Sequence, residues 1–254
     1  MSYFTYKGHS CYYEEIGNGK QLLLLHGNTA SSKMFSLIVE KYSSDYKVIL
    51  IDFLGHGQSD RLHKFPIDLW YDEAEQVIEF LKQKNYKNVY IIGSSGGALA
   101  AINVALEAPE LVDKVIADSF EGEVPLKTYT QNIAKDREGS KNDENAKMFY
   151  QYMHGDDWEI IVDNDTNVII EHDKIIGKFF HNPLNDLKAK ILMTGSKEAE
   201  FISILDKDYF DYIYGNMIKK IGHGKYYLFD KGGHPAMLSN HEKFIEISKQ
   251  FFNE

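Results

Sequence analysis

Short apolar runs alternate along this chain with longer segments in which apolar residues recur every three or four positions. A continuous apolar run is typical of a strand buried on both faces of a sheet, and the longer spacing is typical of an amphipathic helix. The runs predict strands over residues 21–25, 47–51, 89–92, 114–117, 190–193 and 226–229. Near the start, two stretches predict a pair of short antiparallel strands, 3–7 and 11–16. The longer segments predict helices over 31–42, 70–84, 97–108 and 243–252.

This alternation of strands and helices predicts an α/β fold. A helix between two strands forms a crossover unit, and repeated units build a mostly parallel sheet with helices on both faces. We therefore expect a doubly wound central sheet of about eight strands, the sum of the predicted runs.

One long segment breaks the alternation. Residues 121–187 are rich in Asn, Asp, Lys and aromatic residues, with helical spacing only around 129–135 and 145–154. A structureless loop of this length is unusual in a compact domain, so the segment predicts an inserted helical lid. The expected division is a first part of the core over 1–120, the lid over 121–187, and a second part of the core over 188–254.

Composition narrows the class of protein. The 254 residues suit one domain with an insertion, and a hydrophobic fraction of 43% suffices for a packed core. The net charge of −10 argues against nucleic acid and anionic membranes as partners. No apolar run approaches the length of a membrane span, and residues 1–21 are too charged for a signal peptide. Cys11 is the one cysteine, so no internal disulfide is possible, and we expect an inert thiol and a cytoplasmic protein.

The clearest chemical signal is the sequence Gly93-Ser94-Ser95-Gly96-Gly97, which directly follows the predicted strand 89–92. It reads G-x-S-x-G between a strand and a helix, the pattern of a sharp turn that exposes the hydroxyl of the central serine. Small neighbours are needed because strand and helix nearly touch at such a turn. Ser95 is the predicted nucleophile rather than Ser94, because a turn centred on Ser94 would need a small residue where Ile92 stands.

A nucleophilic serine needs a base and donors for the oxyanion. His234 is the candidate base, because it follows two glycines in the loop after the last predicted strand. The backbone N–H of Gly96, next to the nucleophile, is one predicted oxyanion donor. Asn28, in the loop after strand 21–25, is the other, and its neighbour His26 is expected to brace this loop rather than to react.

Four short signatures now occur in order along the chain, at Leu25–Asn28, Asp52–Ser59, Gly93–Gly97 and Gly233–His234. Together they resemble the α/β-hydrolase superfamily, and specifically its lidded, esterase-like branch with a serine nucleophile. In that superfamily the segment matching Asp52–Ser59 is a structural turn, so we assign it no chemistry. Haloalkane dehalogenases and epoxide hydrolases of the superfamily carry Asp at the nucleophile position. The serine found here excludes both activities.

The resemblance implies a third catalytic residue, an acid after the strand 190–193. The family pattern there is Gly-x-x-Asp, and Glu198 takes the place of the acid in this chain. Glu200 is its first rival. Some relatives carry the acid one strand earlier, which would make Asp118 or Glu121 the acid.

The predicted activity is that of a serine hydrolase acting on a small or medium carboxylic ester or a related acyl compound. The predicted triad is Ser95, His234 and Glu198, with no cofactor and no metal ion, and the expected partner is a small-molecule acyl substrate rather than nucleic acid or a membrane. The lid would select the substrate, and Trp158 and the lid tyrosines would line an acyl site or pack the lid's own core. Carbon–carbon bond hydrolysis of diketones, peroxide-dependent acyl chemistry and ligand sensing with a retained triad are the alternatives. The sequence leaves the oligomeric state open.

Overall fold

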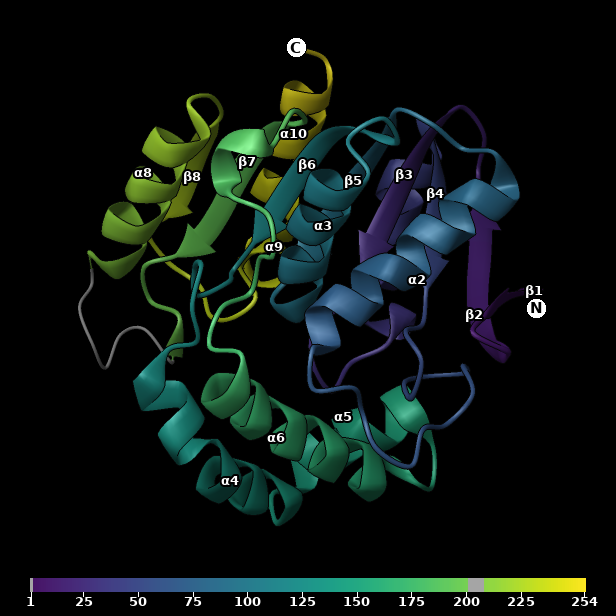
Figure 1. The fold of residues 1–254 in the computed structure, drawn as a ribbon, viewed down its shortest axis with the longest axis vertical. Coiled ribbons are helices and arrows are strands. Elements are labelled where there is room, and N and C mark those ends of the chain that lie inside the picture. The colour runs from purple at the N-terminus through teal and green to yellow at the C-terminus, as the bar shows by residue number, and fades with distance from the viewer. Residues whose placement is uncertain (1, 201–207) are drawn as a thin grey trace.

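Eight strands form one sheet in the computed structural model, which describes residues 2–200 and 208–254 (Figure 1). They run in the spatial order β1-β2-β4-β3-β5-β6-β7-β8. β1 pairs antiparallel with β2, and β2 pairs antiparallel with β4, whereas all other neighbours are parallel. The strands are β1 (Ser2–Tyr6), β2 (His9–Ile16), β3 (Lys20–Leu25), β4 (Tyr46–Ile51), β5 (Val89–Ser94), β6 (Val112–Asp118), β7 (Lys190–Ser196) and β8 (Lys225–Phe229). The predicted doubly wound α/β sheet is confirmed.

The sheet is buried on both faces, as its continuous apolar runs predict. In β3, Leu22, Leu23, Leu24 and Leu25 are all fully buried, and successive side chains join two different apolar clusters. One cluster lies under α2 (Leu69–Lys84), α3 (Gly96–Glu107) and α8 (Tyr209–Ile221). The other lies under α1 (Val39–Ser43), α9 (Ala236–Ser239) and α10 (His241–Phe252). The helices therefore form a layer on each side of the sheet (Figure 1).

Three helices between β6 and β7 lie beyond the carboxyl ends of the strands (Figure 1). We call α4 (Lys127–Lys141), α5 (Glu144–His154) and α6 (Trp158–Ile175) the cap helices. A small apolar cluster of Tyr150, Trp158 and Val162 holds α5 on α6. A short 3₁₀ helix, η2 (Leu184–Asp186), leads from the cap back to β7. The carboxyl ends of the parallel strands thus face a helical cover.

One predicted helix differs from that in the structure, and the helix α8 was not predicted. The single helix expected over 31–42 is a 3₁₀ helix, η1 (Ser32–Phe35), followed by the short α1. The Ser32 N–H donates to the Asp52 carboxylate (2.7 Å), and the turn continues through i→i−3 bonds such as Ser36 N to Lys33 O, so this segment is tied to the core before an α-helix can form. The α8 helix was not predicted, although Phe210, Tyr214, Met217 and Ile221 form a buried stripe at helical spacing.

Candidate active site

Ser95 occupies the turn between β5 and α3. Its backbone has φ 55° and ψ −119°, a conformation that a non-glycine residue rarely adopts. A Cβ at Gly93 would overlap the Gly97 carbonyl, and a Cβ at Gly97 would overlap the carbonyl oxygens of Leu25 and His26. Both glycines of the motif are therefore required by close backbone approach, which holds the serine in its strained turn.

The loop after β3 packs directly on this serine. A Cβ at Gly27 would lie 2.9 Å from the Cβ of Ser95, so only glycine fits without movement. The His26 ring is buried, accepts the Phe53 N–H at Nε2 (3.1 Å) and donates from Nδ1 to the Gly27 carbonyl (2.9 Å). Burial lowers the pKa of His26, so the ring is neutral and braces the loop, as predicted.

Asn28 is held from two sides. Its side-chain Nδ2 donates to Asp165 on α6 (2.7 Å), and its Oδ1 accepts from Trp70 Nε1 on α2 (3.2 Å). The amide lies against Gly96, where a Cβ would overlap the Asn28 Oδ1. Neither the Asn28 N–H nor the Gly96 N–H donates to an acceptor among the described residues, and Gly96 is at the amino end of α3. Both N–H groups are therefore free to donate to an anion in the cavity.

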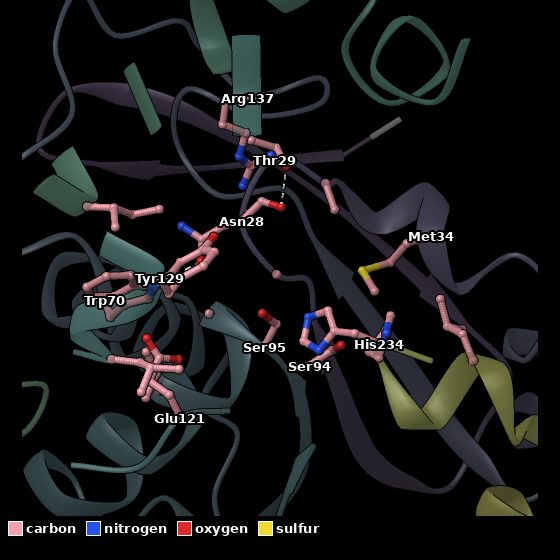
Figure 2. A pocket seen from close by; sticks show the side chains of 18 of the residues that line it. Asn28, Thr29, Met34, Trp70, Ser94, Ser95, Glu121, Tyr129, Arg137 and His234 are labelled. Atoms are coloured by element: carbon pink, nitrogen blue, oxygen red, sulfur yellow. Dashed lines mark hydrogen bonds between the residues drawn. The ribbon is translucent and has the colours of Figure 1, made fainter. Parts of the chain in front are cut away.

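His234 lies in the loop between β8 and α9, and its ring faces the Ser95 hydroxyl across the cavity floor (Figure 2). The loop is fastened at several points. The Ser196 hydroxyl donates to the Gly232 carbonyl, and the Lys197 N–H donates to the Phe229 carbonyl (3.0 Å). These contacts fix the path of the chain that carries the imidazole to the serine.

The four candidate acids lie in different surroundings. Glu198 is exposed. Glu200 accepts the backbone N–H of His234 at Oε2 (3.0 Å) and lies against Gly233, where a Cβ would crowd its carboxylate. Asp118 is fully buried, accepting the Thr194 hydroxyl (2.6 Å) and the Met237 N–H (3.1 Å). Glu121 lines the cavity on the side of Ser95 away from His234 (Figure 2). Of the four, Glu200 makes the contact with the His234 loop.

The structure also shows the contacts of two further groups that the sequence singled out, Asp52 and Trp158. Asp52 accepts the N–H groups of Ser32 (2.7 Å) and Gln58 (2.8 Å), so the Asp52–Ser59 turn is structural, as expected. Trp158 stacks on Tyr150 with ring centroids 5.4 Å apart, inside the core of the cap helices. Of the aromatic residues in the cap helices, Tyr129 and Phe149 line the cavity.

A cavity of about 460 Å³ lies above Ser95 and His234. Most of its remaining wall is apolar and comes from Met34, Leu99, Leu126, Phe149, Ile169 and Leu238. Arg137 on α4 also lines it and is paired with the fully buried Asp165 at 3.5 Å. Burial by itself lowers the pKa of Arg137, but Tyr129 and Asp165 outweigh this effect and raise it, so the guanidinium remains charged.

His234 and Glu121, which also line the cavity, have shifted pKa values as well. Burial lowers the pKa of His234 to about 4, with Glu200 opposing the shift and Arg137 adding to it. A neutral imidazole at pH 7 can accept a proton. Burial raises the pKa of Glu121 to about 7. Both shifts follow from removing the groups from water at one site, which is common where chemistry occurs.

Three site residues were missed by sequence reasoning: Trp70, Arg137 and Asp165. Asp165 does carry a readable signal, because it falls on the buried stripe of α6 with Trp158 and Ile161. A carboxylate in an apolar stripe requires a buried partner. The identity of the partners, Asn28 and Arg137, has no local signal in the sequence.

No three His, Cys, Asp or Glu side chains in residues 2–200 and 208–254 are grouped so as to hold a metal. None of the helices in the same ranges combines the length and apolar character needed to cross a bilayer.

Known proteins resemble this chain in sequence over part or nearly all of its length. A pimeloyl-[acyl-carrier protein] methyl ester esterase of Aliivibrio salmonicida is 36% identical over 107 residues, which cover 42% of this chain and 38% of that relative. The chain thus spans less than half the length of this curated relative. A proline iminopeptidase of Clostridioides difficile is 24% identical over an alignment of 295 positions, covering 99% of this chain and 97% of the relative.

Solved structures share the whole fold. A serine hydrolase from the polyaromatic hydrocarbon-degrading bacterium Cycloclasticus zankles superposes with a TM-score of 0.76 at 18% identity, covering 99% of this chain and 97% of the other. An esterase from Exiguobacterium antarcticum gives 0.73 at 20% identity, with 97% of each chain covered. The model of the alpha/beta hydrolase fold family matches residues 20–153, more than half of the sequence. The chain belongs to the α/β-hydrolase family.

Proposed function

We propose that this protein is a serine hydrolase that cleaves a small or medium carboxylic ester, or a related acyl compound, through an acyl-enzyme. The observation that carries the proposal is the position of Ser95. It is held with φ 55° at the amino end of α3, on the floor of a 460 Å³ cavity, and it faces His234. This combination exposes a hydroxyl to the substrate and sets a base beside it.

In the proposed reaction, the Ser95 oxygen attacks the carbonyl carbon while His234 accepts the hydroxyl proton. The carbonyl oxygen becomes an oxyanion that accepts the N–H groups of Gly96 and Asn28, each donor worth about 3 kcal/mol of transition-state stabilisation. The tetrahedral intermediate then expels the alcohol, which takes the proton from His234. Water, deprotonated by the same imidazole, releases the acid and restores Ser95.

We propose Glu200 as the acid of the triad. The sequence predicts Glu198, and that assignment remains the competing hypothesis. Two observations support Glu200: it hydrogen-bonds the His234 backbone, and its charge acts on the His234 imidazole by raising the pKa of that ring. A carboxylate in this position stabilises the imidazolium that forms during the reaction.

The segment 121–187 is proposed to be a lid on a core formed by residues 1–120 and 188–254. Support comes from the cap helices, which contribute Tyr129, Arg137 and Ile169 to the cavity wall. A lid of this kind shapes the acyl site and keeps water from the intermediate. The contact from Asp165 to Asn28 also suggests that the lid positions the oxyanion loop, which goes beyond the substrate selection expected from the sequence.

The test is a panel of p-nitrophenyl esters of increasing acyl length. We expect turnover of the shorter esters and its loss in Ser95→Ala, whereas Ser94→Ala, which removes the neighbouring hydroxyl, should retain it. Full turnover by Ser95→Ala would contradict the mechanism. A Ser95 that reacts with a phosphonate in a protein that turns over no ester would favour the ligand-sensing alternative.

A further inference from the structure

The cavity above Ser95 contains two charged side chains in addition to the proposed catalytic residues. Arg137 enters from α4, and Glu121 follows β6 directly. The remaining wall is largely apolar, so each charged group must be compensated by the protein or by a ligand. The contacts of the two groups differ and identify which of them is available to a substrate.

The Arg137 guanidinium already has hydrogen-bond and charge partners within the protein. Its Nη1 donates to the Thr29 hydroxyl (2.7 Å) and to the Tyr150 hydroxyl (3.0 Å), and its Nη2 lies 3.5 Å from the Asp165 carboxylate. The Asp165 side chain is fully buried and that of Arg137 is 15% exposed, so the two charges compensate each other inside the protein. An anionic substrate would have to compete with a buried carboxylate for this guanidinium.

Glu121 has no such partner. Among the described residues, no Lys, Arg or His forms an ion pair with its carboxylate, and the hydrogen bond that the carboxylate accepts comes from its own backbone N–H. Its backbone is fixed, because the Tyr209 hydroxyl donates to the Glu121 carbonyl (2.8 Å). Its side chain points into the cavity below Trp70 and Tyr129 (Figure 2). Burial raises its pKa to about 7, which reflects the missing compensation.

We propose that Glu121 binds an ammonium group of the substrate, so that the enzyme prefers acyl compounds carrying an amine over their neutral analogues. An ammonium supplies the missing positive charge and donates to the carboxylate. Trp70 and Tyr129 line the same cavity, and aromatic rings attract cations. This inference rests on the proposed serine hydrolase activity, and it names the substrate class of that activity.

The experiment compares pairs of methyl esters that differ only in charge. The esters of glycine, β-alanine and 6-aminohexanoic acid are each assayed against the ester in which CH₃ replaces NH₃⁺. We expect kcat/KM for at least one amino ester to exceed that of its neutral partner by about tenfold or more, as charge-assisted hydrogen bonds do. Glu121→Gln should bring this ratio close to one, because glutamine keeps the shape and removes the charge.

Glu123→Gln is the matched control. Glu123 lies two residues away, pairs with Lys220 (2.6 Å) and is not part of the cavity wall, so this variant should keep the wild-type ratio. The ratio cancels any general loss of activity. If no amino ester is preferred, or if Glu121→Gln retains the preference, the inference is wrong even though hydrolysis of neutral esters still supports the proposed function.

A binding measurement separates the two hypotheses if no ester is hydrolysed. Isothermal titration of the wild type with butylammonium and with 1-butanol should show about tenfold tighter binding of the cation. That difference should disappear in Glu121→Gln and persist in Glu123→Gln. Equal binding of the two probes by the wild type would overturn the assignment of Glu121 whatever the catalytic result.

Discussion

The floor and the roof of the cavity are built in different ways. The floor, formed by Ser95, Gly96 and the loop after β3, is held by backbone contacts so close that Gly93 and Gly97 leave no room for a Cβ. The roof, formed by the cap helices, is held by buried side-chain pairs such as Asp165 with Arg137. In the floor, a side chain added at either glycine would displace the backbone. In the roof, substitution of a few side chains can alter the polar groups without moving the backbone.

The two regions meet at Asn28. Its backbone belongs to the floor, and its side-chain Nδ2 donates to the Asp165 carboxylate of the roof (2.7 Å). Substitutions in the floor should therefore affect bond cleavage directly, whereas substitutions in the roof should affect it through the position of Asn28. The following predictions run from the largest expected effect to the smallest.

The largest effect should come from His234 on the floor. His234→Ala should lower kcat on the order of 10³-fold or more, because the imidazole that faces Ser95 would be lost. In the wild type, the depressed pKa of about 4 keeps the imidazole neutral above that value, so kcat/KM should persist at pH 5 and fall as pH drops through 4. A profile that falls near pH 6.5, or a variant with nearly normal kcat, would count against His234 as the base.

The triad acid should give the next largest effect. Glu200→Gln should lower kcat on the order of 10²-fold or more, since the imidazolium would lose its stabilising charge, while Glu198→Gln should remain close to the wild type. The two variants differ by two positions and have the same chemistry, so they control for each other. If only Glu198→Gln showed a large loss of kcat, the triad acid would be Glu198, as the sequence predicts.

Backbone packing of the floor can be tested without touching a catalytic group. Gly97→Ala should lower the free energy of unfolding by about 3 kcal/mol, because its methyl group would overlap two carbonyl oxygens. Gly139→Ala is the control, since Gly139 lies in α4 with no atom near its missing Cβ. Chemical denaturation should show a gain of about 0.5–1 kcal/mol there. Equal effects at the two glycines would contradict the account of the floor.

The smallest effect should come from the link between roof and floor. Asp165→Asn should lower the free energy of unfolding by about 2 kcal/mol, because Arg137 loses its buried counter-charge. It should also lower kcat about tenfold with little change in KM, if Asn28 is displaced from the oxyanion. Asp163→Asn on the exposed side of α6 is the control. A change in stability with unaltered kcat would reduce Asp165 to a structural role.

The same contrast explains what could be predicted from the sequence. The floor is encoded locally, so Gly93–Gly97 and His26–Asn28 indicated the turn and its neighbouring loop, and the apolar runs predicted the sheet. The roof depends on pairs far apart in the chain, such as Asn28 with Asp165, and neither residue alone identifies the other. The triad acid also could not be predicted from local sequence. The family spacing indicates Glu198, whereas the contact between Glu200 and the His234 loop depends on how the chain turns after β7.

The most direct measurement of the central claim is the site of covalent labelling. The protein would be treated with a small fluorophosphonate, digested, and analysed by mass spectrometry, alongside Ser95→Ala and Ser94→Ala. The account predicts one adduct, on Ser95, in the wild type and in Ser94→Ala, and no adduct in Ser95→Ala. An adduct on Ser94 alone, or hydrolysis of esters by a protein that takes no label, would contradict it.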